Sequence, residues 1–92
     1  MIRSFRHKGL KRLFESGDQR GVPAELARKL IRQLDFLNAA VEVTDMYLPG
    51  YALHELKGER KGTWATKVTG NWRITFTFED GDADDVDFED YH

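Results

Sequence analysis

The sequence predicts an α+β fold of two layers, in which helices pack on one face of a small antiparallel sheet. Apolar residues at helical spacing dominate the chain up to Val41. Beyond residue 62, apolar and polar residues alternate, and Gly70-Asn71 and Asp80-Gly81 have the composition of hairpin turns. A chain of 92 residues allows one domain with a small core, so residues 1–92 are treated as a single unit.

A short strand and a helix are expected at the start of the chain. Residues 2–5 alternate between apolar and polar side chains, which predicts the strand. Residues 7–15 then change to helical periodicity, and Gly17 is placed to end that helix. The apolar face of this helix consists of Leu10, Leu13 and Phe14.

A longer second helix follows the connection Gly21-Val22-Pro23. Proline suits the first position of a helix, because its missing N–H has no intrahelical acceptor there. From that point apolar residues recur every three or four positions, which predicts one buried face. A further short turn is expected within residues 42–46, before Pro49-Gly50 stops any helix. The predicted apolar face consists of Leu26, Leu30, Leu34, Leu37 and Val41.

Three antiparallel strands are expected to complete the fold. The first covers residues 63–69, and the last carries Val86 and Phe88 as its inward residues. Between them, residues 72–78 alternate so that every second side chain is large and apolar. Arg73 must therefore point to the opposite, polar face of the sheet. The inward side chains of this central strand are Trp72, Ile74, Phe76 and Phe78.

Composition excludes several classes of protein. The chain has no cysteine, so disulfides, thiolate metal sites and cysteine nucleophiles are excluded. No apolar run approaches the roughly 20 residues of a membrane helix, and no signal-peptide pattern is present. No phosphate-binding glycine loop, metal-ligand set or serine nucleophile motif is present. A soluble cytoplasmic protein without a cofactor, a metal or a membrane partner is expected.

Charge is distributed unevenly along the chain. Residues 1–34 contain nine Lys or Arg against three Asp or Glu, whereas residues 79–92 contain eight Asp or Glu and no Lys or Arg. This asymmetry is typical of proteins with a polyanionic or a complementary protein partner. The alternative interpretation is that each half solvates its own surface and attracts the other.

Cations and one histidine gather before the first predicted strand of the sheet. His54, Lys57, Arg60 and Lys61 lie in a glycine-containing loop that suits contact with phosphate. Arg73, on the polar face, has a donor fork that fits phosphate, or it pairs with Glu79 or Asp87 across the sheet. The corresponding alternatives are a structural role for His54 and simple solvation of the loop.

The last three residues add groups that transfer protons. Asp90, Tyr91 and His92 supply a carboxylate, a phenol and an imidazole. If the final strand lies beside the central ones, these groups approach His54 and Arg73. The combined set suits general acid–base cleavage of a phosphodiester without a metal.

Taken together, LHELKGERKGTWATKVTGNWRITFTF and the terminal EDYH resemble the HigB toxins, a branch of the RelE superfamily of bacterial toxin–antitoxin systems. The resemblance extends from MIRSFRHKGLKRLFESG to the final histidine. It implies a compact RelE-like fold and a ribosome-dependent mRNA endonuclease (mRNA interferase). Such enzymes cut mRNA in the ribosomal A site by metal-independent attack of the ribose 2′-hydroxyl on the adjacent phosphate, and thereby inhibit translation.

The resemblance also implies roles for individual residues. Asp90 or a histidine would take the 2′-proton, and His92 or His54 would protonate the leaving oxygen. Tyr91 would orient the substrate or stack on its base. Lys57 and Arg73 would stabilise the charge that the phosphate gains.

Implied partners are the ribosome, mRNA and a HigA-like helix-turn-helix antitoxin, through which DNA would be contacted only indirectly. The acidic segment from residue 79 motivates an alternative function. In that alternative the chain is a non-catalytic, toxin-like module that binds the antitoxin and co-represses DNA.

Overall fold

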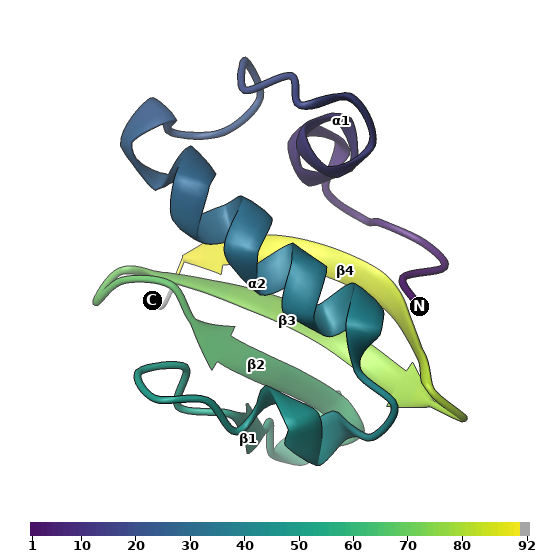
Figure 1. The fold of residues 1–92 in the computed structure, drawn as a ribbon. Helices are drawn as coiled ribbons and strands as arrows, with labels where there is room; N and C mark the ends of the chain where they lie inside the picture. Colours follow the sequence, from purple (N-terminus) through teal and green to yellow (C-terminus); the bar gives the residue numbers. More distant parts are fainter. Residues whose placement is uncertain (91–92) are drawn as a thin grey trace.

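The computed structural model describes residues 1–90 and has the two layers expected from the sequence (Figure 1). The sheet is antiparallel with strand order β1-β2-β3-β4, so every strand pairs with its neighbour in the chain. Both helices lie on one side of this sheet, and its other side carries no helix. The elements are α1 (Lys8–Ser16), α2 (Ala27–Ala39), β1 (His54–Glu55), β2 (Thr63–Lys67), β3 (Trp72–Glu79) and β4 (Asp82–Asp90).

The first residues run beside β4 as an extended segment. Ile2 and Phe5 form isolated parallel bridges to Ala83 and Val86 of β4, so the predicted first strand is present only as two separate pairings. The amide of Arg3 donates to the Ala83 carbonyl over 2.8 Å. This segment covers the outer edge of β4, which reduces the exposure of unpaired backbone groups there.

Helix α1 begins and ends with specific caps. His7 lies at its N-cap, where the Nδ1 atom accepts a hydrogen bond from the Leu10 amide over 3.1 Å. Gly17 ends the helix in the left-handed conformation with a φ of 74°, as the sequence predicts. Gly9 lies on the inner side of α1, where an added Cβ would come within 2.2 Å of the Gly21 carbonyl oxygen. A glycine is therefore needed at position 9 for the close passage of the following loop.

The second helical stretch is shorter than the sequence predicts. It begins with a 3₁₀ turn over Ala24–Leu26 and continues as α2, which ends at Ala39. Val41 lies beyond the end of the helix and its side chain is 74% exposed, so its predicted place on the buried face is wrong. Glu42 caps a separate 3₁₀ turn, Val43–Met46, in the region where a short extra turn was expected.

The antiparallel meander contains one more strand than the three that were expected, because His54 and Glu55 pair with Ala65 and Trp64 as the short β1. Sequence patterns could not predict a strand of two exposed residues, because its pairing depends on the distant β2. The tight connection between β3 and β4 is a two-residue turn in which Asp80 and Gly81 both have positive φ angles, of 52° and 82°. Such turns match the twist of antiparallel strands, which explains the Asp-Gly signal.

An irregularity in β4 changes the register of the sheet. Ala83 and Val86 are both fully buried, although a spacing of three residues would place them on opposite faces of a regular strand. The pairing with β3 shifts between Thr75 and Thr77, and Asp85 has a φ of 53°. This β-bulge inserts one extra residue, so that both side chains reach the core.

The core lies between the helices and the sheet. Gln33 of α2 is buried in it, but its amide is satisfied: Nε2 donates to the Lys67 carbonyl, and Oε1 accepts from the Thr66 hydroxyl over 2.8 Å. In the described residues no helix is long and apolar enough to span a membrane. The largest fully buried side chains are Leu10, Leu13, Leu30, Leu34, Leu37, Met46, Ile74, Phe76 and Val86.

Candidate anion-binding site on the outer face of the sheet

The sheet face that points away from the helices, called the outer face below, collects most of the described candidate residues. Trp64, Thr66 and Ile74 point toward the helices, so their strand neighbours point outward. Arg73 is one of these outward residues, as the sequence predicts. The pairing of His54 with Ala65, and of Ala65 with Thr75, places His54 on the same face. His54 and Thr75 lie on strands that are two positions apart in the sheet, so their backbones are about 10 Å apart.

Arg73 meets a carboxylate across the sheet. It is paired with Glu89 of β4, and its Nη2 atom lies 3.3 Å from Glu89 Oε1. The sequence analysis named Glu79 or Asp87 as the cross-strand partner. That choice was wrong, because the β-bulge moves Glu89 into the position opposite Arg73. Both side chains are more than four-fifths buried, which shields this ion pair from solvent.

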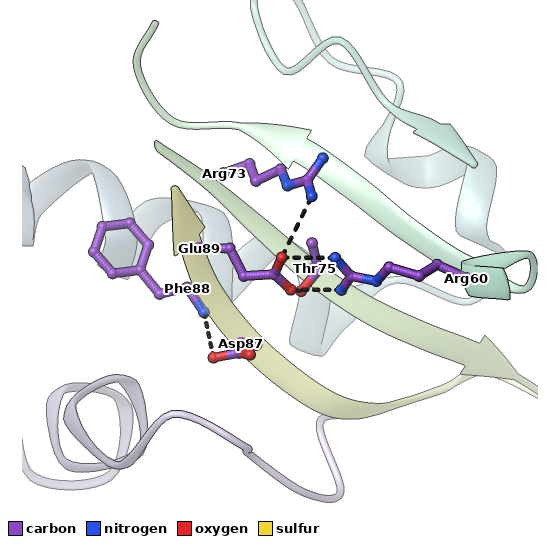
Figure 2. A network of polar contacts seen from close by, with 6 residues as sticks. All are labelled: Arg60, Arg73, Thr75, Asp87, Phe88 and Glu89. Carbon is purple, nitrogen blue, oxygen red and sulfur yellow. Dashed lines mark hydrogen bonds and ion pairs between the residues drawn. The ribbon is translucent and has the colours of Figure 1, made fainter. Parts of the chain in front are cut away.

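Arg60 reaches the same carboxylate from the opposite direction (Figure 2). Its Nη1 and Nη2 atoms donate to the two oxygens of Glu89 over 2.8 and 2.6 Å. This paired geometry matches the guanidinium fork to the carboxylate and is stronger than a single contact. The Thr75 hydroxyl donates to Glu89 Oε2 as a further ligand. The structure thus brings the two predicted RNA-binding arginines together on one acidic residue.

The network changes the acidity of Glu89. The hydrogen bonds from Arg60, aided by that from Thr75, lower the pKa of the Glu89 carboxyl from 4.5 to about 2 despite its partial burial. The same pairing with Glu89 raises the pKa of the Arg60 guanidinium. Glu89 is therefore ionised at neutral pH. The hydrogen-bonded cluster thus joins two guanidinium groups to one ionised carboxylate.

His54 is exposed and held in one orientation by its own turn. Its Nδ1 atom lies 2.9 Å from the Ala52 carbonyl oxygen, which can only accept a hydrogen bond. The neutral imidazole therefore carries its proton on Nδ1, and Nε2 is the nitrogen that can take up a proton. Ala52 itself has a φ of 49°, an uncommon value for a residue with a Cβ. The residue with this uncommon conformation is thus the one whose carbonyl orients the His54 ring.

Lys57 lies in the loop between β1 and β2, here called the cationic loop (residues 57–62). It precedes the 3₁₀ turn Gly58–Arg60 and is exposed. The sequence analysis placed Lys57, Arg60 and Lys61 in one loop, which agrees with the structure. Of these, Arg60 extends across the outer face to β4.

The C-terminal candidates are only partly described. Asp90 is the last residue of β4, is exposed and pairs with Trp72. Neighbouring residues of a strand point to opposite faces of the sheet. Asp90 is therefore on the helix side at its backbone, whereas Glu89 points to the outer face. Tyr91 and His92, the other predicted catalytic residues, lie outside the described residues.

Sequence reasoning missed the roles of Glu89 and Thr75. The inward assignment of Phe88 already implied that Glu89 points outward, on the face of Arg73. That signal was lost among the eight acidic residues of the C-terminal segment, which were treated as one block. The alternation that turns Arg73 outward also turns Thr75 outward, but no contact was predicted for Thr75.

A small polar hollow of about 220 Å³ lies on the outer face next to Arg60. Three threonines and two arginines supply hydroxyl and guanidinium donors to it, and three acidic side chains complete its lining. Within residues 1–90, no cluster of three or more His, Asp or Glu side chains is arranged to hold a metal ion. The donors around this hollow are Arg6, Arg60, Thr63, Thr75 and Thr77.

The fold is a small α+β domain whose outer face carries a polar network of arginine, threonine and glutamate side chains. Residues 3–92 match the family model described as "RelE-like toxin of type II toxin-antitoxin system HigB". The chain is 48% identical to the Endoribonuclease HigB of Proteus vulgaris over 92 residues, which is the full length of both proteins. It is also 31% identical to Toxin HigB-1 of Vibrio cholerae serotype O1 over 85 residues, 90% of each chain. The chain therefore belongs to the HigB-like toxin family of type II toxin–antitoxin systems.

A solved structure agrees with the fold. The crystal structure of YafQ from E. coli strain BL21(DE3) superposes with a TM-score of 0.59, over 99% of this chain and 92% of that one, at 15% sequence identity. Identity this low supports the shared architecture alone. The predicted α+β class and the resemblance to HigB toxins are both confirmed.

Proposed function

We propose that this chain is a ribosome-dependent endoribonuclease that cleaves mRNA in the ribosomal A site and thereby arrests translation and growth. The observation that carries the proposal is the full-length 48% identity to a protein named Endoribonuclease HigB. The outer face adds support, because it combines an available imidazole nitrogen on His54 with the positively charged pair of Arg60 and Arg73.

The chemistry assigned to this face is transfer of the phosphodiester to its own ribose. A base removes the proton of the 2′-hydroxyl, whose oxygen attacks the adjacent phosphorus. The bond to the 5′-oxygen then breaks, and an acid protonates that leaving oxygen. The products are a 2′,3′-cyclic phosphate and a free 5′-hydroxyl. His54 Nε2 is placed to exchange a proton with solvent or substrate, so it can serve in either step.

The remaining assignments follow the resemblance. Asp90 or a histidine is proposed as the base, His92 or His54 as the acid, and Tyr91 as the group that orients or stacks on the substrate base. Lys57, Arg60 and Arg73 would stabilise the extra negative charge on the pentavalent phosphorus. The exposure of Lys57 and the place of the two guanidinium groups on the outer face support that role.

Two partners are proposed. The ribosome would present the mRNA and order it for attack, because the outer face offers few acid–base groups of its own. A HigA-like helix-turn-helix antitoxin would neutralise the toxin, and DNA would be contacted only through that antitoxin. Membership of a type II toxin–antitoxin family supports an antitoxin partner in general terms.

The decisive experiment maps new 5′ ends by primer extension on purified translating ribosomes. The wild-type protein should produce ends within codons at the A site, and chelation of metals should leave the rate unchanged. The variants His54→Ala and His92→Ala should lose cleavage. Cleavage of naked mRNA at the ribosomal rate would contradict the dependence on the ribosome.

The same assay tests the alternative of a non-catalytic module that binds an antitoxin and co-represses DNA. A pure binder would yield no new 5′ ends. The acidic segment that motivated this alternative has internal partners: Asp82 contacts Arg3, Asp84 accepts from Ser4, and Glu89 binds two arginines. Part of its charge is therefore neutralised within the fold, at Asp82 and Glu89, which weakens the argument for an external basic partner.

A further inference from the structure

Glu89 connects three separate parts of the outer face. It belongs to β4, accepts a hydrogen bond from Thr75 of β3 and is held in a paired contact by Arg60 of the cationic loop. Arg60 and Glu89 are 29 residues apart in the chain. The contact spans the face from the β1–β2 connection to the far strand β4 (Figure 2).

The cationic loop depends on such contacts because it contributes no apolar side chain to the core. All six of its residues are exposed, so apolar packing does not hold it against the sheet. Gly58 and Gly62 have φ angles of 70° and 97°, and an added Cβ at either position would meet no atom within 4 Å. The loop is thus bounded by two permissive residues. Its docking relies on polar contacts, chiefly Arg60 with Glu89 and the Gly62 amide with Glu55.

We propose that Glu89 is a positioning residue that docks the cationic loop on the outer face and thereby sets the place of Lys57. This inference rests on the proposed endoribonuclease function and assigns Glu89 no contact with the reacting atoms. Glu89 acts through Arg60, whose guanidinium it fixes by two hydrogen bonds, and it holds that group beside Arg73.

The geometry favours a positioning role. Glu89 accepts hydrogen bonds from both guanidinium groups and from the Thr75 hydroxyl, so it lies at the centre of the contacts that join the loop to the sheet. Asp87 also attracts the Arg60 guanidinium electrostatically. Its own carboxylate accepts a hydrogen bond from the Phe88 amide. The paired contact also removes rotational freedom from Arg60, whose flexible side chain is 42% exposed. A fixed guanidinium can anchor a loop, whereas a solvated one cannot.

The first test measures docking without any assay of activity. In the wild-type protein, the Lys61 amide donates to the Gly58 carbonyl and the Gly62 amide to Glu55. In Glu89→Gln and in Arg60→Gln, exchange of these two amides with solvent should accelerate about tenfold. Glu79→Gln is the matched control, because it removes the same charge from an exposed residue at the end of β3 and should leave the exchange unchanged.

The second test measures cleavage on translating ribosomes. Glu89→Gln should lower kcat by about 100-fold, the order of loss expected when a catalytic group is displaced by about an ångström, with KM changed less than about threefold. The double variant Glu89→Gln with Arg60→Gln should lose less activity than the product of the two single losses, because the Arg60–Glu89 contact is shared by both variants. Arg60→Gln keeps Arg73 paired with Glu89, so it tests the loop even if Glu89→Gln folds poorly.

Each result has a definite consequence. Unchanged amide exchange in both single variants would overturn the proposal, whatever the cleavage assay gives. Faster exchange with wild-type kcat would overturn it as well, because the loop would then be undocked without any effect on catalysis. A wild-type protein that cleaves nothing would overturn the proposed function instead, and amide exchange alone would then decide whether Glu89 docks the loop.

Discussion

Arg73 of β3 and Glu89 of β4 are directly opposite each other, with Nη2 of the arginine 3.3 Å from Oε1 of the glutamate. This pairing exists because Asp85 adds an extra residue to β4 and shifts the register by one position. Without the bulge, a regular ladder continued from Asp80-Gly81 would place Phe88 opposite Arg73. The bulge therefore places the Glu89 carboxylate on the outer face, opposite Arg73.

Stability at low pH should depend on Glu89. Its pKa is about 2 in the folded protein, below its ordinary value of 4.5, so its contribution is complete above pH 4.5 and is lost as the pH falls toward 2. Glu89→Gln should be less stable than the wild type at pH 7, and the difference should shrink between pH 4.5 and 2. Urea unfolding at several pH values measures it. A difference in unfolding free energy that stays constant between pH 4.5 and 2 would contradict the pairing of Glu89 with the arginines.

The conformation of Asp85 should tolerate glycine and reject a β-branched residue. At a φ of 53°, Asp85→Gly relieves the steric cost of a side chain and should leave the free energy of unfolding unchanged or raised. Asp85→Val should destabilise the fold by about 1–3 kcal/mol, because the left-handed region is strained for residues with a Cβ. Thermal unfolding of the two variants provides the comparison. Equal stability of both would argue against the bulge.

Gly9 should resist replacement by alanine, although alanine is the better helix former. An added Cβ would lie 2.2 Å from the Gly21 carbonyl oxygen, so the loop must move. We expect Gly9→Ala to lose about 1–3 kcal/mol of stability. Gly70→Ala is the control, because a Cβ there meets no atom within 4 Å, and it should stay within about 0.5 kcal/mol of the wild type. Chemical denaturation of both variants shows whether the loss at position 9 comes from the close contact with Gly21.

The two described histidines at positions 7 and 54 should have opposite phenotypes. His7 caps α1, so His7→Ala should cost about 1 kcal/mol of stability and leave cleavage intact. His54 is exposed, so His54→Ala should preserve stability and lower cleavage by about 10²–10⁴-fold. Melting temperature and primer extension on ribosomes measure the two effects. Cleavage at the wild-type rate by His54→Ala would remove this residue from the proposed site.

Sequence periodicity predicted most of the fold because it reflects local chemistry. The helical spacing of Leu30, Leu34 and Leu37 and the alternation around Arg73 identify which faces are buried, and both survive in the structure. The same patterns were less reliable at the ends of elements. Val41 continues the spacing of α2, but the helix stops at Ala39 and the valine is exposed.

The candidate site was predictable in part. The resemblance and the alternation pointed to His54, Lys57, Arg60 and Arg73, which all belong to the outer face or to the loop beside it. Glu89 was not predicted as their partner. Asp90 shares a strand with it but pairs with Trp72, which no pattern in the sequence indicates.

By itself, the sequence determined the two layers, the buried faces of the helices and of β3, and the family, since these depend on residue types at short spacings. Only the tertiary structure decided that Arg60 and Arg73 meet on one carboxylate. That meeting depends on strand register and on a contact between residues 29 positions apart. Such contacts require the whole chain to be folded, because a bulge of one residue at Asp85 changes every later pairing in β4.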